Sequence, residues 1–303
     1  MQSVQSLWSG YGEIARYASP KHNKTYIVKH IAAPKQQTHP RGWNTQTSHQ
    51  RKLQSYKIEA RFYRDYALLC DQHCAVPKLL AEFSEQPQQI LVMQDLDSMG
   101  FAVRKTSVDL KDVRLGIKWL AFFHGRFLQQ DLTKLWPIGT YWHLKTRQEE
   151  FDVMQQGSLK QAAKTIDEIL NQASFQTLLH GDAKLANFCF AADGQVAAVD
   201  FQYVGGGCGM KDVAYFIGSC LDEDACAVYE EQLLDHYFAA LKNAISVYQP
   251  MLDAQALEAD WRPLFEFAWA DFHRFLKGWC PGHWKINSYS ERISKEVIAS
   301  ITS

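Results

Sequence analysis

Two short segments concentrate the side chains that chemistry at a phosphate would need. The first is His180-Gly-Asp-Ala-Lys-Leu-Ala-Asn187, and Asp200-Phe-Gln202 follows it, so that Asp182 lies five residues before Asn187 and eighteen before Asp200. One carboxylate can orient and deprotonate a hydroxyl group, while a second carboxylate and an amide oxygen are hard ligands for Mg²⁺. These groups are the minimum set for phosphoryl transfer from a nucleotide, which needs positioning, charge neutralisation and a base.

The residues between the two segments predict how they meet. Asn187 to Ala191 and Gln195 to Asp200 are separated by the turn Ala192-Asp193-Gly194. Asp-Gly between two such runs is typical of a β-hairpin. Because a hairpin returns the chain beside itself, we expect Asp182, Asn187 and Asp200 to converge on one pocket.

Strand signals gather in the first hundred residues. The β-prone runs are Glu13 to Ala18, Thr25 to Ile31 and Gln89 to Leu96, with a polar loop predicted at Pro34 to Gln50 and a helix at Leu53 to Cys70. Alternating and compact apolar runs favour strands, whereas apolar residues three and four apart favour a helix.

Helix signals dominate beyond about residue 100. Ser107 is a candidate N-cap for a helix that carries Val113, Ile117 and His124 on one stripe, a second run covers residues 159–173, and helical patterns resume near Asp212. We therefore predict an α+β protein with an N-terminal sheet domain at residues 1–97 and a helical domain at residues 98–303.

Composition excludes several classes of function. The 303 residues include 32 Lys and Arg against 33 Asp and Glu, a net charge of −1, which lacks the basic surplus of a nucleic-acid binder or of a polybasic membrane anchor. No apolar run approaches the ~20 residues of a membrane span, and the first residues do not resemble a signal peptide. Seven scattered cysteines are typical of a reduced chain, so we expect a cytoplasmic protein. Cys280-Pro-Gly-His283 lacks a second ligand pair, which disfavours structural zinc.

The motif around Asp182 resembles the catalytic and metal-binding motifs of the protein-kinase-like superfamily. It is most similar to the small-molecule branch, which comprises the aminoglycoside phosphotransferases, the choline kinases and the ecdysteroid-kinase-like proteins. Those families carry His-Gly-Asp, an Asn five residues after the Asp, and a downstream Asp in an Asp-Phe or similar pair. The resemblance extends in order over roughly residues 7 to 240 and implies a bilobal α+β fold.

The resemblance also implies a nucleotide site in the first hundred residues. Lys29, after Val28, resembles the phosphate-binding lysine, and Glu59, thirty residues on, resembles its ion-pair partner. The strand ending in Gln94, Asp95 and Leu96 resembles the hinge, whose backbone groups would contact adenine. ATP and Mg²⁺ are therefore the expected cofactors.

In the same resemblance, Asp182 is the catalytic base, and Asn187 and Asp200 bind the metal. Lys184 has two interpretations, because it would either touch the transferred phosphate or acceptor or face solvent. His180 is expected to support the loop rather than to act on substrate. Asp212 is expected to accept hydrogen bonds from the loop backbone, and His124 is expected to be a satisfied core histidine.

Three features keep two interpretations each. Gly10 and Gly12 would either approach phosphates or form a hairpin turn. The glycine-rich run Gly205 to Gly209 would form an anion nest or, as we favour, a mobile lip. The C-terminal aromatic residues would form core or, with Asp271, a cage for a quaternary ammonium such as choline.

The predicted activity is ATP- and Mg²⁺-dependent phosphorylation of a hydroxyl group on a small molecule, with choline, ethanolamine, an aminoglycoside, a sugar or a steroid alcohol all open. A protein kinase is a first alternative, which the eleven residues between Asp200 and Asp212 disfavour because they leave little room for a peptide platform. A catalytically silent nucleotide-binding module is the second. The sequence does not predict the oligomeric state.

Overall fold

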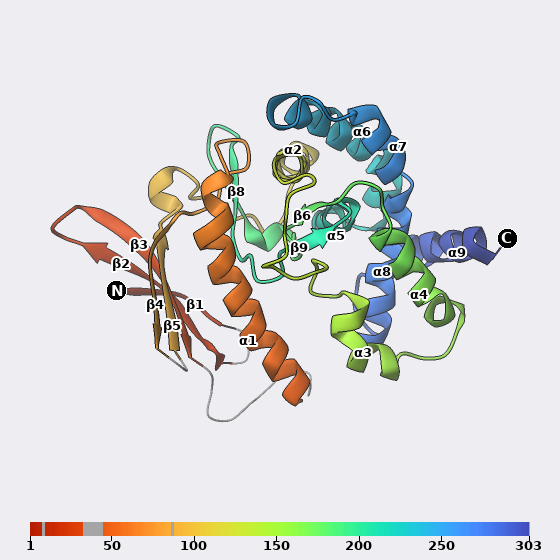
Figure 1. Ribbon diagram of the computed structural model, residues 1–303, viewed down its shortest axis with the longest axis horizontal. Coiled ribbons are helices and arrows are strands. Elements are labelled where there is room, and N and C mark those ends of the chain that lie inside the picture. Colours follow the sequence, from red (N-terminus) through yellow and green to blue (C-terminus); the bar gives the residue numbers. More distant parts are fainter. Residues whose placement is uncertain (8–9, 33–44, 86–87, 303) are drawn as a thin grey trace. The chain divides into compact units, whose positions relative to one another are not determined.

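The computed structural model of the protein describes residues 1–7, 10–32, 45–85 and 88–302. Contacts divide the chain into two compact units, the first formed by Met1–Arg104 with Cys189–Gln202 and the second by Lys105–Phe188 with Tyr203–Ser303. The first unit contains a five-stranded sheet and the second is mainly helical (Figure 1). This organisation confirms the predicted α+β class.

The sheet of the first unit is antiparallel throughout. Its strands lie in the order β1 (Gln2–Ser6), β2 (Gly12–Ser19), β3 (Lys24–Ala32), β5 (Gln88–Gln94) and β4 (Leu79–Glu85). The central strand β3 places Lys29 opposite Ile14 on one side and Leu91 on the other. The predicted strands correspond to β2, β3 and β5, whereas β1 and β4 were not predicted.

Helix α1 (Gln46–Arg61) packs against this sheet (Figure 1). The Thr45 side chain caps it by accepting a hydrogen bond from the Ser48 N–H at 3.0 Å. Tyr56 of α1 is buried in one cluster with Tyr11 and Ile31 of the sheet unit. The helix continues as a π-turn, Phe62–Tyr66, and a 3-10 turn, Ala67–Leu69.

The start of α1 corrects the predicted loop and helix. The helix begins at Gln46, so the last five residues of the predicted loop 34–50 are helical and precede the predicted start at Leu53. Residues 34–44 of that loop lie outside the described residues.

The predicted hairpin is confirmed. Strand β7 (Phe188–Phe190) pairs with β8 (Val196–Ala198), and the Ala191 N–H donates to the Gln195 carbonyl at 2.9 Å. Phe190 also pairs with Val103, so the hairpin is attached to the first unit.

The second unit is mainly helical, and its helix α8 is largely buried. Its helices are α2 (Leu110–Arg126), α3 (Gln148–Val153), α4 (Ser158–Asn171), α5 (Met210–Cys220), α6 (Glu223–Tyr248), α7 (Ala254–Trp261), α8 (Leu264–Trp279) and α9 (Ser288–Thr302). It also contains 3-10 turns at Leu144–Arg147 and Leu185–Asn187, and the first unit contains one at Asp97–Met99. Helix α2 is capped by Asp109, whose side chain accepts from the Asp112 N–H at 2.9 Å, so the predicted cap at Ser107 was wrong. The predicted helices at 159–173 and from near Asp212 correspond to α4 and to α5 onward.

The glycine-rich run forms a strand rather than a nest or a lip. β9 (Gly205–Gly207) pairs with β6 (Thr177–Leu179). A β-carbon on Gly205 would lie 2.3 Å from the Trp136 carbonyl oxygen. Glycine is therefore required here because a neighbouring backbone packs directly against the strand.

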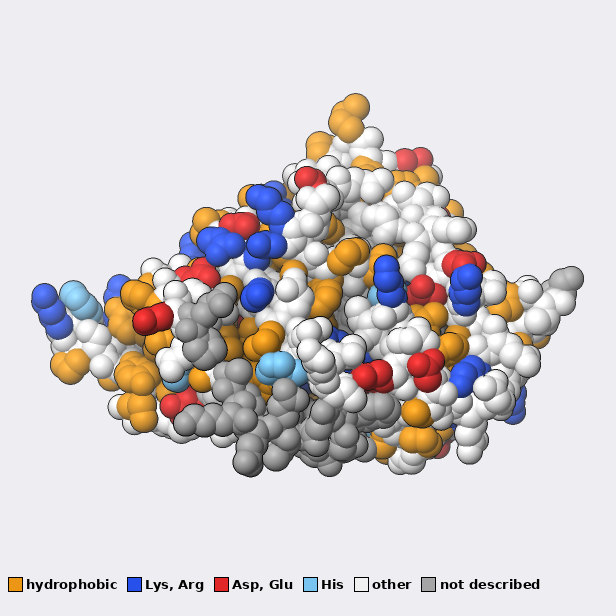
Figure 2. Space-filling view, turned by 60° about the horizontal axis from the view of Figure 1, so that its bottom comes forward, with side chains coloured by type: hydrophobic (Ala, Val, Ile, Leu, Met, Phe, Trp, Pro, Cys, Tyr) orange, Lys and Arg blue, Asp and Glu red, His pale blue; other side chains and the backbone are white. Residues whose placement is uncertain are grey.

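The described surface carries both signs of charge. On the face in Figure 2, Lys and Arg side chains are interspersed with Asp and Glu side chains, as the net charge of −1 leads us to expect. Within the described ranges, every helix is too short or too polar to cross a bilayer.

Candidate active site

Lys29 and Glu59 form a buried ion pair in the first unit. The Lys29 ammonium donates to both Glu59 carboxylate oxygens, at 2.8 and 2.7 Å, and the two residues are only 2% and 1% exposed. Burial alone would lower the pKa of Lys29, but the charges of Glu59 and Asp200 outweigh burial and raise it. Lys29 is therefore held as a cation at a fixed position.

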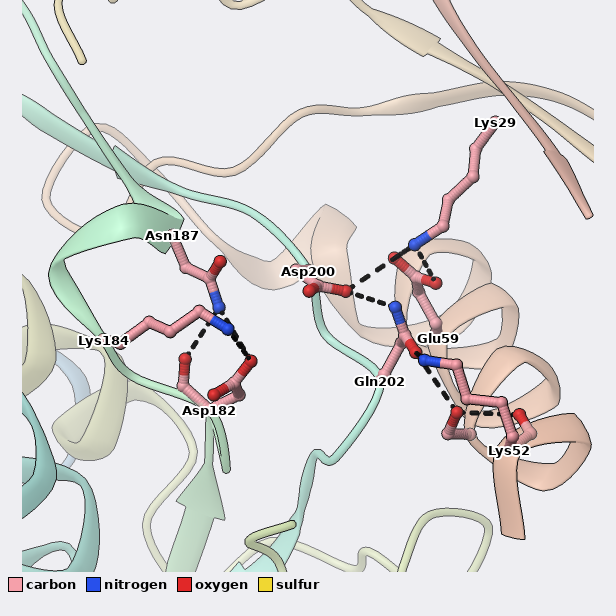
Figure 3. Close-up of polar contacts among 9 residues, drawn as sticks. Lys29, Lys52, Glu59, Asp182, Lys184, Asn187, Asp200 and Gln202 are labelled. Carbon is pink, nitrogen blue, oxygen red and sulfur yellow. Dashed lines mark hydrogen bonds and ion pairs between the residues drawn. The ribbon is translucent and has the colours of Figure 1, made fainter. Parts of the chain in front are cut away.

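Asp200 belongs to the same network. Its Oδ1 lies 3.6 Å from the Lys29 ammonium and accepts a hydrogen bond from the Gln202 amide (Figure 3). The Gln202 amide oxygen in turn accepts from the Lys52 ammonium at 2.8 Å and the Ser55 hydroxyl at 3.2 Å. Helix α1 thus positions the carboxylate through Gln202 as well as through Glu59 and Lys29.

The backbone around Asp200 is held in an unusual conformation. Asp200 has a φ of 70°, in the left-handed region that costs a non-glycine residue of order 1 kcal/mol. The next residue, Phe201, is fully buried and stacks on Phe62 with ring centroids 4.0 Å apart, with Tyr63 edge-on at 5.7 Å. This aromatic packing fixes the Asp200 backbone against the end of α1.

The three residues predicted as the hinge lie at and just after the end of β5 in the first unit. The Gln94 N–H is occupied, because it donates to the Lys78 carbonyl at 3.0 Å. The Asp95 side chain is buried and accepts from the Arg16 guanidinium at 2.6 Å; burial raises the pKa of Asp95, but the hydrogen bonds to this carboxylate lower it overall. The Leu96 N–H has no hydrogen-bond partner among the described residues. Leu96 therefore differs from Gln94, whose N–H is already paired.

The loop containing Asp182 lies in the second unit. The Lys184 ammonium donates to Asp182 Oδ2 at 2.8 Å, and the Asn187 amide nitrogen donates to the Asp182 carbonyl at 2.8 Å and to Oδ2 at 3.1 Å (Figure 3). Asp182 is 8% exposed. The structure therefore brings Asp182, Lys184 and Asn187 together.

Asp212 braces this loop, as predicted. Its carboxylate, at the start of α5, accepts from the backbone N–H groups of His180 at 2.6 Å and Gly181 at 2.9 Å. His124 lies between Asp212 and Tyr237, 3.2 Å and 2.7 Å away respectively. Because a carboxylate accepts from His124 Nε2, the Nδ1 atom is left to accept from the Tyr237 hydroxyl. His124 is thus a satisfied core histidine, and His180 supports the loop.

Two tyrosines that the sequence analysis did not single out lie beside the loop of Asp182. The Tyr141 hydroxyl donates to the Tyr215 hydroxyl at 3.2 Å, and the Tyr141 N–H donates to the carbonyl of Gly181, the residue before Asp182, at 3.0 Å. Burial is the main cause that raises the pKa of both phenols, with the Asp182 charge acting in the same direction. Tyr215 follows Asp212 in an aromatic run that also predicts core, so the sequence carried little signal for it.

Gln202 and Lys52 were missed for a similar reason. Gln202 lies in the quoted motif, two residues after Asp200, and that position was the available signal. Lys52 is separated from it by 150 residues, so only the fold reveals the contact.

Gly10 and Asp271 are both paired within the first and second units respectively. The Gly10 N–H donates to the Leu7 carbonyl at 3.1 Å and is therefore occupied by the connection between β1 and β2. Asp271 is buried and accepts from Arg274 at 2.6 Å, so the proposed cage around Asp271 does not form.

The oxygen donors proposed for Mg²⁺ fit a hard cation chemically. Figure 3 shows the Asn187 amide nitrogen turned toward Asp182 and its oxygen turned away, and this oxygen has no hydrogen-bond donor among the described residues. The Asp200 side chain is 34% exposed, so solvent and ions reach it. A carboxylate and an amide oxygen are ligands that Mg²⁺ accepts.

Sequence comparison supports the resemblance to small-molecule kinases. The profile of the ecdysteroid kinase-like family matches residues 136–250, which include the Asp182 loop, the hairpin and α5. A search of the curated proteins finds no match to the chain.

Solved structures establish the fold. An ethanolamine kinase of Plasmodium vivax superposes with a TM-score of 0.54 at 10% identity, over 98% of this chain and 83% of that chain. An amicoumacin kinase in complex with AMP-PNP, Ca²⁺ and Ami gives a TM-score of 0.52 at 12% identity, over 99% and 88%. The macrolide 2′-phosphotransferase of Brachybacterium faecium gives 0.52 at 11%, over 99% and 90%. The chain therefore has the bilobal kinase-like α+β fold.

Proposed function

We propose that this protein is an ATP- and Mg²⁺-dependent kinase that transfers the γ-phosphoryl group to a hydroxyl group of a small molecule. The observation that carries the proposal is the buried Lys29–Glu59 pair with Asp200 3.6 Å from the same ammonium. A lysine that supports structure alone would be satisfied by Glu59. A second carboxylate, held beside it in a strained backbone conformation, suits a site that must accept phosphates together with their metal.

Each residue of the candidate site has its own role in the proposed transfer. Lys29 binds the nucleotide phosphates, Glu59 orients Lys29, and the Leu96 N–H contacts adenine. Asp182 orients the acceptor hydroxyl and accepts its proton as the hydroxyl attacks the γ-phosphorus in line, while the bond from that phosphorus to the β–γ bridging oxygen breaks and ADP leaves. Lys184 stabilises the charge that spreads over the phosphoryl oxygens.

Asn187 and Asp200 would hold Mg²⁺. Bound there, the metal would neutralise charge on the phosphates. The short chain between Asp200 and Asp212 continues directly from β9 into α5, which supports a small acceptor rather than a protein substrate.

The test is transfer from ATP to a panel of small alcohols in the presence of Mg²⁺, followed as ADP formation and as phosphorylated product. We expect Asp182→Asn to lower transfer by about 10³-fold or more, with the affinity for Mg²⁺ and AMP-PNP preserved, because it removes the base but keeps the loop. Asp200→Ala should weaken nucleotide binding more than Asp182→Asn does. Asp193→Asn, in the exposed hairpin turn, is the matched control.

Three outcomes would contradict this proposal. A wild-type protein that binds nucleotide and Mg²⁺ but transfers nothing across the panel would be the silent module. Phosphorylation of generic proteins would indicate the protein-kinase alternative. Equal losses of nucleotide affinity in the two aspartate variants would refute the assigned roles.

A further inference from the structure

A lysine lies within a cage of aromatic rings in the helical unit. Lys285, in the turn between α8 and α9, places its ammonium 4.8 Å from the ring centroid of Tyr215, 5.4 Å from that of Trp284 and 5.6 Å from that of Phe272. The rings come from α5, from α8 and from the turn itself. We call Lys285 with these three rings the lysine cage.

Tyr215 connects the lysine cage to the loop of Asp182. Its hydroxyl accepts from the Tyr141 hydroxyl at 3.2 Å, and the Tyr141 N–H donates to the carbonyl of Gly181, the residue before Asp182, at 3.0 Å. The Lys285 ammonium lies 4.8 Å from the centroid of the Tyr215 ring. Lys285 is also close enough to Asp182 and Lys184 for their charges to act on its pKa. The lysine cage is therefore beside the carboxylate to which we assign the acceptor hydroxyl.

The Lys285 ammonium has no anionic partner in the described part of the chain. The nearby cation Lys184 is paired with Asp182 at 2.8 Å. No Asp or Glu oxygen of the described residues forms an ion pair with Lys285. Burial lowers the pKa of Lys285 to about 8, as expected for a cation that has lost water without gaining a carboxylate.

We infer that the lysine cage is the acceptor subsite and that the acceptor is an alcohol carrying an anionic group, a carboxylate, on an apolar or aromatic body. The inference rests on the proposed function, because phosphoryl transfer at Asp182 is what makes this an acceptor site. The anionic group pairs with Lys285, the body packs on the rings, and the hydroxyl reaches Asp182. A quaternary ammonium acceptor is disfavoured, since the cage already holds a cation of the chain.

The test observes Lys285 directly, by NMR of its ε-methylene group in full-length protein labelled with ¹³C-lysine. Lys285→Arg assigns the resonance. The probes are benzoate, 4-(hydroxymethyl)benzoate, phenyl phosphate, benzyl alcohol and benzyltrimethylammonium, each added with Mg²⁺ and AMP-PNP present. We expect both carboxylates to bind at millimolar concentration and to raise the pKa of Lys285, because an anion favours its charged form.

The variants separate this subsite from general effects of charge. Lys285→Met keeps the length of the side chain and should weaken benzoate binding about tenfold or more, while Lys285→Arg should restore most of it. Benzyltrimethylammonium should bind Lys285→Met more tightly than wild type, because the cage then lacks its own cation. Lys164→Met changes a lysine on α4 whose side chain is 84% exposed, and it should change the affinity for neither benzoate nor benzyltrimethylammonium. Unchanged affinity for Mg²⁺ and AMP-PNP checks the fold of each variant.

Tighter binding of phenyl phosphate than of benzoate would assign the subsite to a phosphate and overturn the choice of a carboxylate. The whole inference fails if no anion moves the Lys285 resonance, or if benzyltrimethylammonium binds wild type as tightly as benzoate does. These results differ from failure of the kinase proposal. Benzoate binding at Lys285 without any phosphoryl transfer would refute the kinase alone, whereas transfer to neutral alcohols with an unmoved Lys285 would refute the subsite alone.

Discussion

A lysine as completely buried as Lys29 is costly unless an anion compensates its charge. Glu59→Gln removes the bidentate partner and leaves Asp200 as the remaining one, so we expect the free energy of unfolding to fall by about 2–4 kcal/mol and nucleotide affinity to fall with it. Urea denaturation measures the first effect. Glu168→Gln, whose side chain is 53% exposed and faces Lys164, is the control and should cost about 0–1 kcal/mol. Equal losses of unfolding free energy in Glu59→Gln and Glu168→Gln would show that the buried ion pair stabilises the fold no more than an exposed one.

Gln202 is expected to act through Asp200 rather than on the nucleotide. Gln202→Ala removes the amide that joins Asp200 to Lys52 and Ser55, so the affinity for Mg²⁺ and AMP-PNP should fall about 10- to 100-fold, as when the hydrogen-bond partner of a metal ligand is lost. Calorimetry with and without Mg²⁺ tests this, because a positioning effect should disappear without the metal. Gln195→Ala, in the same hairpin, should leave the affinity unchanged.

Lys285 should give stability a distinctive pH dependence. Its pKa of about 8 in the folded protein lies below its ordinary value of 10.5, so the charged lysine destabilises the fold fully below pH 8, and this cost disappears as the pH rises from about 8 to 10.5. Because the residue is partly exposed, we expect Lys285→Met to be about 1–2 kcal/mol more stable at pH 7.

The difference in free energy of unfolding between Lys285→Met and wild type should largely disappear by pH 10. Urea denaturation at pH 7 and at pH 10 measures it. The other groups that act on Lys285, namely Asp182, Lys184, Cys220 and Cys226, are present in both proteins, as is Tyr215, and they cancel in the comparison. A gap of the same size at both pH values would mean that Lys285 keeps its ordinary pKa.

At the scale of elements, the sequence predicted the parts whose patterns are local. Alternating or compact apolar runs identified β2, β3 and β5, and Asp193-Gly194 identified the hairpin. Strand β1 was missed because all five of its residues are exposed, so no buried face marks it. Strand β9 was missed because its three glycines carry no side-chain pattern. Gly205 is required by the Trp136 backbone that packs against it.

The residues of the candidate site also fall into those that local sequence motifs predicted and those that only the fold reveals. Asp182, Asn187, Asp200, Lys29 and Glu59 follow from motifs of fixed spacing. Lys52, Tyr215 and Lys285 depend on contacts between elements that are far apart in sequence, and no spacing rule links them, whereas Gln202 lies two residues after Asp200 in the motif. Their roles could only be found from three-dimensional packing.

The loop that carries Asp182 depends on one backbone conformation. Gly181 has a φ of 77°, and a β-carbon there would lie 2.0 Å from the Tyr203 carbonyl oxygen. Gly181→Ala should therefore lower the free energy of unfolding by about 3 kcal/mol or more and abolish transfer. Gly157→Ala, with nothing within 4 Å of the added carbon and an extended φ of 165°, should cost about 1 kcal/mol or less in the same thermal and chemical denaturation series. Similar costs at both glycines would show that the loop tolerates a side chain.

At the scale of the molecule, the groups assigned to one reaction come from both compact units. Lys29, Glu59 and Asp200 belong to the sheet unit, and Asp182, Lys184 and the lysine cage belong to the helical unit. The hairpin connects them, since the chain passes from the second unit into the first at residue 189 and back at residue 203. The proposed transfer therefore requires residues of both units.

The most direct test of this account is a crystal structure with AMP-PNP and Mn²⁺, in which anomalous scattering locates the metal. We predict that the metal is bound by Asp200 and Asn187, that the Lys29 ammonium contacts the phosphates, and that Asp182 faces the γ-phosphate without binding the metal. A metal bound elsewhere, or phosphates out of reach of Lys29, would contradict the assignment of this protein as a kinase.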